Sequence, residues 1–174
     1  ADFWGAKFSD DAHFETSKFS GYTSFEGTRF NNTADFDAAQ FSKEAYFNDA
    51  QFNGTADFTS IWFKEEALFK NTTFKGELSL TRARYNKLFI RWHNIEGGLV
   101  YDDTAYLSLL KNFKDLGYFE DYDYCYFEYR KERRNQPLPL VGDGEAAIRK
   151  GIDFLLEWFY GYGTKPIRPL VFSL

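Results

Sequence analysis

The first half of this chain is governed by one repeat, in which a large apolar residue returns after five residues, then after six, then after five again. Sixteen consecutive positions obey this spacing, and no phenylalanine before residue 86 lies outside it. The residue two places before each position is mostly Ala, Ser or Thr. The repeat positions, which we predict to form the structural core, are Phe3, Phe8, Phe14, Phe19, Phe25, Phe30, Phe36, Phe41, Phe47, Phe52, Phe58, Phe63, Phe69, Phe74, Leu80 and Tyr85.

This spacing favours an extended coil over a helix. On an α-helix, steps of five and six residues would place successive rings on two stripes about 140° apart, and the intervening polar residues and glycines are poor helix formers. A chain that turns a corner after every repeat position avoids this, because four positions then complete one lap of 22 residues. Residues 22 apart would stack in four columns, with the small residue two places earlier also facing inward. We therefore predict a mainly β fold of about four coils, with an α-helical C-terminal part.

The repeat unit resembles that of the pentapeptide-repeat family. The family unit is a small residue, a polar residue, an apolar centre and two further polar residues, as in Ala34-Asp35-Phe36-Asp37-Ala38 and Ala56-Asp57-Phe58-Thr59-Ser60. The resemblance implies a right-handed quadrilateral β-helix, which we assign to residues 1–86. This chain adds one residue to every second step, and we expect the addition to widen alternate corners, as a bulge does in a sheet. The added residues are Asp11, Tyr22, Thr33, Glu44, Thr55, Glu66 and Glu77.

Behind the repeat, the aromatic composition changes from Phe to Tyr near residue 86, where we predict a domain boundary. Residues 87–103 carry apolar side chains suited to closing the coil, so we predict a cap there. Residues 104–136 are expected to form a helical hairpin. Its first helix would be N-capped near Asp102 and ended by Gly117, and its second would open at Asp121. The residues expected to pack across the hairpin are Tyr106, Leu109, Leu110, Phe113, Leu116, Tyr122, Cys125, Tyr126 and Tyr129.

Residues 137–144 are a linker by composition, and the pattern of residues 145–174 predicts an amphipathic helix followed by a membrane-proximal segment. In that segment aromatic residues adjoin basic ones, which is typical of a membrane-entry site on the cytoplasmic side. A helix packed on the hairpin is the alternative that the sequence leaves open. The residues predicted to be membrane-proximal are Trp158, Tyr160, Tyr162, Lys165 and Arg168.

A narrower resemblance rests on the order of the parts. A pentapeptide repeat, a helical segment and the run Tyr160-Gly161-Tyr162-Gly163-Thr164-Lys165-Pro166 resemble the soluble part of pentapeptide-repeat proteins with a C-terminal membrane domain, often a two-helix ion-channel pore. The resemblance implies that any pore lies beyond Leu174, because no apolar run here reaches the roughly 18 residues that span a bilayer. The chain begins without Met inside a repeat, so we expect a fragment trimmed at both ends, with an open N-terminal coil.

The side chains that could carry chemistry do not form a recognisable set. His13 and His93 lie far apart without a partner pattern for zinc or for nucleophilic catalysis. Cys125, the sole cysteine, is expected to be a buried and inert thiol on a helix face, and its isolation suggests a reducing compartment. The acidic residues near Asp102 and Asp121 are explained by helix N-termini. We therefore predict no enzyme activity, no cofactor and no metal site.

Charge limits the partners. The net charge is −5, and residues 1–86 hold 13 acidic and 9 basic side chains, which argues against binding nucleic acid through a basic groove. We predict a non-enzymatic structural and interaction module on the cytoplasmic side of a membrane. It would assemble or regulate a membrane protein such as an ion channel, and bind protein partners, copies of itself included. A second hypothesis comes from family members whose acidic rods mimic duplex DNA and bind type II topoisomerase (gyrase). Against it, basic residues interrupt the acidic surface here, namely Lys7, Lys18, Lys43, Lys64, Arg82 and Arg84.

Overall fold

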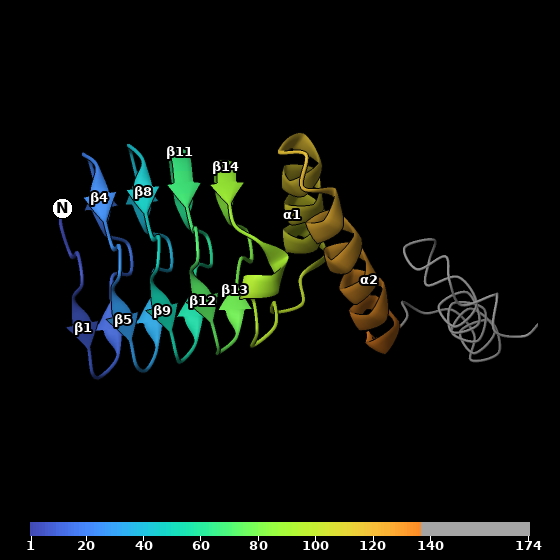
Figure 1. Cartoon of the computed structure of the whole chain (residues 1–174), viewed down its shortest axis with the longest axis horizontal. Coiled ribbons are helices and arrows are strands. Elements are labelled where there is room, and N and C mark those ends of the chain that lie inside the picture. The colour runs from blue at the N-terminus through green and yellow to red at the C-terminus, as the bar shows by residue number, and fades with distance from the viewer. Residues whose placement is uncertain (137–174) are drawn as a thin grey trace, which may run out of the picture.

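Each side of the coil is a very short strand, because one outward and one inward residue fill the space between two corners. A computed structural model describes residues 1–136 and stacks the strands along one axis, with two helices at the C-terminal end of the stack (Figure 1). The strands are β1 (Lys7–Phe8), β2 (Ala12–His13), β3 (Lys18–Phe19), β4 (Thr23–Ser24), β5 (Arg29–Phe30), β6 (Ala34–Asp35), β7 (Gln40–Phe41), β8 (Ala45–Tyr46), β9 (Gln51–Phe52), β10 (Ala56–Asp57), β11 (Trp62–Leu68), β12 (Thr73–Phe74), β13 (Leu78–Ser79) and β14 (Arg84–Phe89).

The strands pair in parallel with partners 22 residues away, as the repeat predicts. Phe8 lies opposite Phe30, and Phe19 lies opposite Phe41. Two sides of the solenoid form the sheets β1-β5-β9-β12 and β13-β10-β6-β2. The other two sides belong to one sheet, ordered β3-β7-β11-β8-β4 with β14 also paired to β11, because β11 continues around a corner. The predicted β-solenoid of about four coils is confirmed.

The five-residue corners are tight β-turns. At the first, the Ala6 amide donates to the Phe3 carbonyl at 3.0 Å, and Gly5, between them, has a φ of 64°. Glycine adopts this left-handed conformation without strain, whereas a side chain costs about 1–2 kcal/mol there. Six equivalent corners nevertheless hold other residues, at φ from 54° to 57°. They are Thr16, Ala38, Asp49, Ser60, Asn71 and Arg82.

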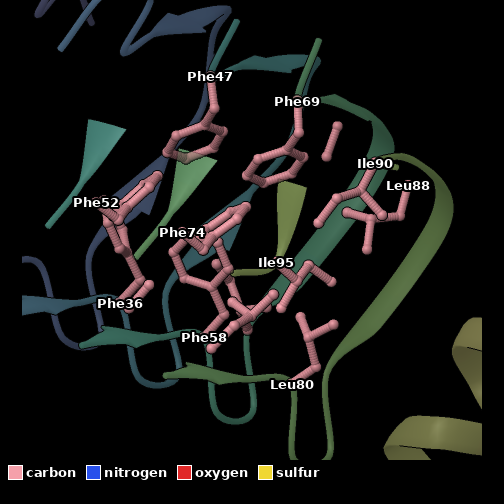
Figure 2. Packing of buried hydrophobic residues seen from close by; sticks show 14 of the residues in the cluster. Phe36, Phe47, Phe52, Phe58, Phe69, Phe74, Leu80, Leu88, Ile90 and Ile95 are labelled. Atoms are coloured by element: carbon pink, nitrogen blue, oxygen red, sulfur yellow. The ribbon is translucent and has the colours of Figure 1, made fainter. Parts of the chain in front are cut away.

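Aromatic rings stacked face to face fill the inside of the coil (Figure 2). In one column the Phe47 ring lies 5.0 Å from Phe25 and 4.8 Å from Phe69, with interplanar angles of 6° and 1°. The stacking changes between Phe36 and Phe58, whose rings meet at 72°, in the column where the next coil presents a leucine. The rings from Phe25 to Phe74 are buried, whereas those of the first lap are partly buried because they have a neighbouring coil on one side only. The first-lap rings are Phe3, Phe8, Phe14 and Phe19.

The stacking continues past residue 86, where we expected the solenoid to end. The register shifts by one residue at the corner after Phe63, so that Ala67 pairs with Leu88, 21 residues away. Phe74 then bridges to Ile95. In Figure 2 Ile90 continues the row of Phe47 and Phe69, and Ile95 that of Phe52 and Phe74. The predicted cap at residues 87–103 therefore begins as a further partial coil in which aliphatic residues replace the rings.

Two helices cover the end of this partial coil (Figure 1). A short 3-10 helix, η1 (Trp92–Asn94), precedes α1 (Asp103–Asp115), which is capped by Asp102 accepting from the Ala105 amide at 2.8 Å. Gly117, with a φ of 72°, ends α1, and α2 (Phe119–Asn135) opens two residues before the position that the sequence predicted. The side chains buried in this region include Tyr106, Leu109, Leu110, Phe113, Asp121, Cys125 and Tyr129.

Candidate interaction surfaces

The outward residue of each strand stacks on its counterpart in the next coil, so each side of the solenoid has its own chemical character. The side formed by β2, β6, β10 and β13 carries the outward residues His13, Asp35 and Asp57, and we call it the acidic face. The side formed by β4, β8 and the later parts of β11 and β14 carries Tyr46, Leu68 and Phe89, and we call it the aromatic face. In a four-sided coil these two faces lie opposite each other, since one side separates them in either direction.

On the acidic face, His13 has partners that the sequence analysis did not assign. Its Nδ1 lies 2.9 Å from Oε1 of Glu15, and Asp35 of the next coil brings a carboxylate oxygen within 4.8 Å of both side chains. The hydrogen bond to Glu15 raises the pKa of His13, while burial raises the pKa of Asp35. His13 and Glu15 are exposed, and the carboxylates of Asp35 and Asp57 each accept a backbone N–H two residues ahead at 2.9 Å. These aspartates thus stabilise the turns that follow them.

Between these faces, one side of the coil carries a partly buried tryptophan flanked by two cations. The Trp62 ring has Nζ of Lys64 at 4.6 Å and Cζ of Arg84 at 4.5 Å from its centroid. Such contacts contribute about 0.5–1 kcal/mol each at exposed sites. Lys64 and Arg84 thus place positive charge beside Trp62, so the acidic residues do not surround the rod evenly.

The helical end is fixed to the last coil by two buried polar side chains. The Asn112 side chain accepts from the Leu88 amide at 3.0 Å and donates to the Leu88 carbonyl at 2.8 Å, so it pairs with β14 as a further strand would. Asp121, only 3% exposed, accepts from Nε of Arg91 and from the Trp92 amide, both at 2.7 Å. The sequence explained Asp121 by the helix N-terminus alone. Its structural role is to bind α2 to the partial coil.

The remaining candidate groups are buried and suited to structure. Cys125 has no exposed surface, and burial raises the pKa of its thiol, which disfavours the reactive thiolate. The Tyr85 hydroxyl is buried without a hydrogen-bond partner among residues 1–136, and burial raises its pKa. An accessible nucleophile with an adjacent base does not occur at either group.

The predicted membrane-proximal residues Trp158, Tyr160, Tyr162, Lys165 and Arg168 lie outside the described residues, as do the predicted linker and amphipathic helix. Within residues 1–136, neither helix combines the length and the apolar character required to cross a bilayer.

A stack of parallel 22-residue laps with ladders of like side chains defines this protein as a β-solenoid repeat protein. A family model of nine pentapeptide repeats matches residues 14–62 and 38–84, and the repeat region of this chain belongs to the pentapeptide-repeat family. The comparisons with curated proteins and with solved structures returned no match.

Proposed function

We propose that this chain is a non-enzymatic interaction module that joins a rigid solenoid to a membrane-embedded partner region. Pentapeptide-repeat solenoids generally serve as interaction modules, and the chemically distinct faces of this one offer surfaces for protein partners. We further propose that the module lies on the cytoplasmic side of a membrane. There it assembles or regulates a membrane protein such as an ion channel.

The observation that carries this proposal is the attachment of α1 and α2 to the last coil. Asn112 and Asp121 hold both helices through hydrogen bonds to the coil. A partner bound on the solenoid therefore has a fixed position relative to the C-terminal end of α2. A hairpin joined only by a flexible linker would not transmit position in this way. The aromatic and basic pattern of residues 158–168 then supports a membrane as the neighbour of this rigid body.

Co-sedimentation with vesicles tests the membrane part of this proposal. We expect the 174-residue chain to bind vesicles rich in anionic phosphatidylglycerol, and the double variant Trp158→Ala/Lys165→Ala to lose most of that binding. Trp62→Ala/Lys64→Ala removes the same residue types from the solenoid and should bind as the unchanged chain does. Equal binding by both variants, or none by the unchanged chain, would contradict the membrane proposal while leaving the interaction module intact.

Self-association is a separate part of the proposal. The aromatic face carries the partly buried side chains of Tyr46, Leu68 and Phe89 in one row, and a second copy could cover them. Sedimentation velocity over a range of concentrations should show a dimer that the substitution Tyr46→Asp, at an outward position of this face, weakens. A monomer at every concentration would contradict it.

The second candidate, mimicry of duplex DNA towards a type II topoisomerase, is favoured by one observation. Asp35 and Asp57 stack on the same face as His13 and Glu15 and line it with carboxylates. The cations around Trp62 weigh against it, because they break the negative surface of the rod. A gyrase supercoiling assay separates the candidates, with inhibition supporting mimicry and an unchanged rate excluding it.

A further inference from the structure

A cavity of about 490 Å³ lies where the end of the solenoid meets the helices. Its lining comes from the corner before β13, from the partial coil, and from both α1 and α2, so it exists only because the helices are docked. The volume falls in the range of about 300–1,000 Å³ that is usual for small-ligand sites. This space is therefore large enough for an organic molecule.

Three neighbouring aromatic rings form one part of the lining. The Trp92 and Tyr106 rings lie 6.3 Å apart, and the Tyr101 and Tyr106 rings lie 6.0 Å apart. Tyr106 is buried against the core, while Trp92 and Tyr101 are partly exposed, so the rings descend from the surface into the cavity. Aromatic rings attract ammonium groups through their negative faces.

The charged lining residues within the described part of the chain are all acidic. Glu77 and Glu96 are exposed residues of the solenoid and its partial coil, and Glu128 and Glu132 are partly buried residues of α2. The lining residues that belong to residues 1–136 include no Lys, Arg or His. Lys131, just outside, pairs with Glu128 at 2.7 Å. Burial is the main cause that raises the pKa of Tyr106, with smaller contributions from Cys125, Glu128 and Glu132.

Helix stability explains only one of the two glutamates of α2, since Glu128 pairs with Lys131 three residues further along the helix. Glu128 and Glu132 are four residues apart, so their like charges repel on one helix face. Glu132 also lies in the last turn of α2, at the negative end of its dipole, where cations rather than anions are favoured. A bound cation would offset both unfavourable interactions.

The separation of the carboxylates determines the kind of cation. Among residues 1–136, His13, Glu15 and Asp35 are the acidic, His or Cys side chains whose possible ligand atoms converge within 4.8 Å in a group of three. The cavity glutamates do not form such a group. A single metal ion needs such convergence. Carboxylates spread around an aromatic-lined space instead match an extended molecule with several positive groups joined by apolar carbon chains.

We propose that this cavity, between the partial coil and the helices, binds an aliphatic polyammonium ligand. The ammonium groups would pair with the glutamates of the solenoid and of α2, and the methylene chain would pack on Trp92 and Tyr106. A free linear polyamine and a lysine-rich segment of a partner protein share this chemistry. The site is independent of the membrane proposal.

Isothermal titration calorimetry of the full chain with spermidine tests the assignment. We expect saturable binding to one site, and Glu128→Gln/Glu132→Gln should weaken it by about tenfold or more. The matched control Glu65→Gln/Glu120→Gln removes the same charge from exposed positions outside the cavity and should change the affinity less than about twofold. Thermal unfolding of each variant shows whether the fold is retained. Trp92→Leu tests the aromatic wall separately.

The outcomes are distinguishable. Saturable binding that the cavity variant weakens and the control retains supports the site. Equal weakening in both double variants would show general attraction to an acidic protein, and no binding by the unchanged chain to any polycation would likewise overturn the proposal. A trilysine peptide run in parallel identifies the source, since tighter binding of the peptide assigns the cavity to a partner's lysines and tighter binding of spermidine to a free polyamine.

Discussion

The solenoid and the helix pair α1 and α2, which we call the helical cap, cover apolar surface in two different ways. In the solenoid every interior ring meets a ring in the same position one lap away, as Phe47 meets Phe25 and Phe69. In the helical cap, the contacts described for residues 1–136 do not follow the 22-residue repeat. Its attachment depends on Asn112 bound to the Leu88 backbone and on Asp121 bound to Arg91 and Trp92.

Because of this difference, the two regions lose stability through different kinds of substitution. Nearest-neighbour stacking distributes stability along the solenoid, so a defect is felt by the adjacent coils and least at the ends. The helical cap is instead attached through a few buried polar groups. Removing the partner of any one of them leaves a buried donor or acceptor unsatisfied, which lowers the free energy of unfolding.

Removing an interior ring should cost the most. Phe41 has no exposed surface and stacks at 4.6 Å on Phe19 and at 5.0 Å on Phe63, so Phe41→Ala should lower the unfolding free energy by about 3–5 kcal/mol. Phe19→Ala removes a partly buried ring from the end of the same column and should cost about half as much. Chemical denaturation followed by circular dichroism measures both. Equal losses would show that position in the stack does not matter.

Breaking the polar attachment of the cap should have the next largest effect. Asn112→Ala leaves the buried Leu88 N–H without a partner and removes one of the donors to the Leu88 C=O, which keeps the Ile90 amide at 3.0 Å. This change should cost about 1–3 kcal/mol. Faster hydrogen exchange at the Leu88 amide would accompany that loss. Ser108→Ala, one turn earlier on α1, is the control and should be nearly neutral. If both variants unfold alike, the Asn112 contacts do not fix the helices.

Relieving a strained corner should stabilise the solenoid. Ala38 has a φ of 55°, so Ala38→Gly should raise the unfolding free energy by about 1 kcal/mol. Ser20→Gly introduces glycine at a corner without positive φ and should instead destabilise slightly, because it adds only freedom to the unfolded chain. Thermal melting of the two variants in opposite directions is the expected result. A loss of stability in Ala38→Gly would refute the strain at this corner.

The smallest effect concerns alkaline pH and the cap. Burial, aided by the hydrogen bond to Asp103, raises the pKa of Tyr101 to about 12. Since the folded pKa exceeds the unfolded value of about 10, the stabilisation from the neutral hydroxyl is complete below pH 10 and is lost as the pH rises towards 12. Tyr101→Phe should therefore make the denaturation midpoint less sensitive to pH in this window. Tyr22→Phe, at a residue 62% exposed, should leave that sensitivity unchanged.

The same contrast decides what the sequence could predict. The columns of the solenoid follow from the residue spacing, because each contact repeats the local pattern of inward and outward side chains. The register shift after Phe63 has no such signal, and the pairing of Ala67 with Leu88 arises only when the last lap closes. The left-handed corners were also missed, since residues such as Ala38 and Arg82 give no hint of positive φ.

In the cap, the helices themselves were predictable from apolar spacing and from Asp102 and Gly117. Their docking was not, because Asn112 and Asp121 bind residues 24 and 30 positions away with no repeat to align them. The grouping of His13 with Asp35 could have been found by applying the 22-residue spacing to the outward residues. The cavity at the junction required the docked helices.

Cysteine cross-linking tests the in-register stack most directly. Gln51 on β9 and Thr73 on β12 are partners across adjacent coils, so Gln51→Cys/Thr73→Cys should oxidise readily to a disulfide without loss of thermal stability. Gln51→Cys/Lys75→Cys, displaced by two residues, should stay reduced under the same conditions. Rapid disulfide formation in the displaced pair, or its failure in the aligned pair, would contradict the stacking of coils at a spacing of 22 residues.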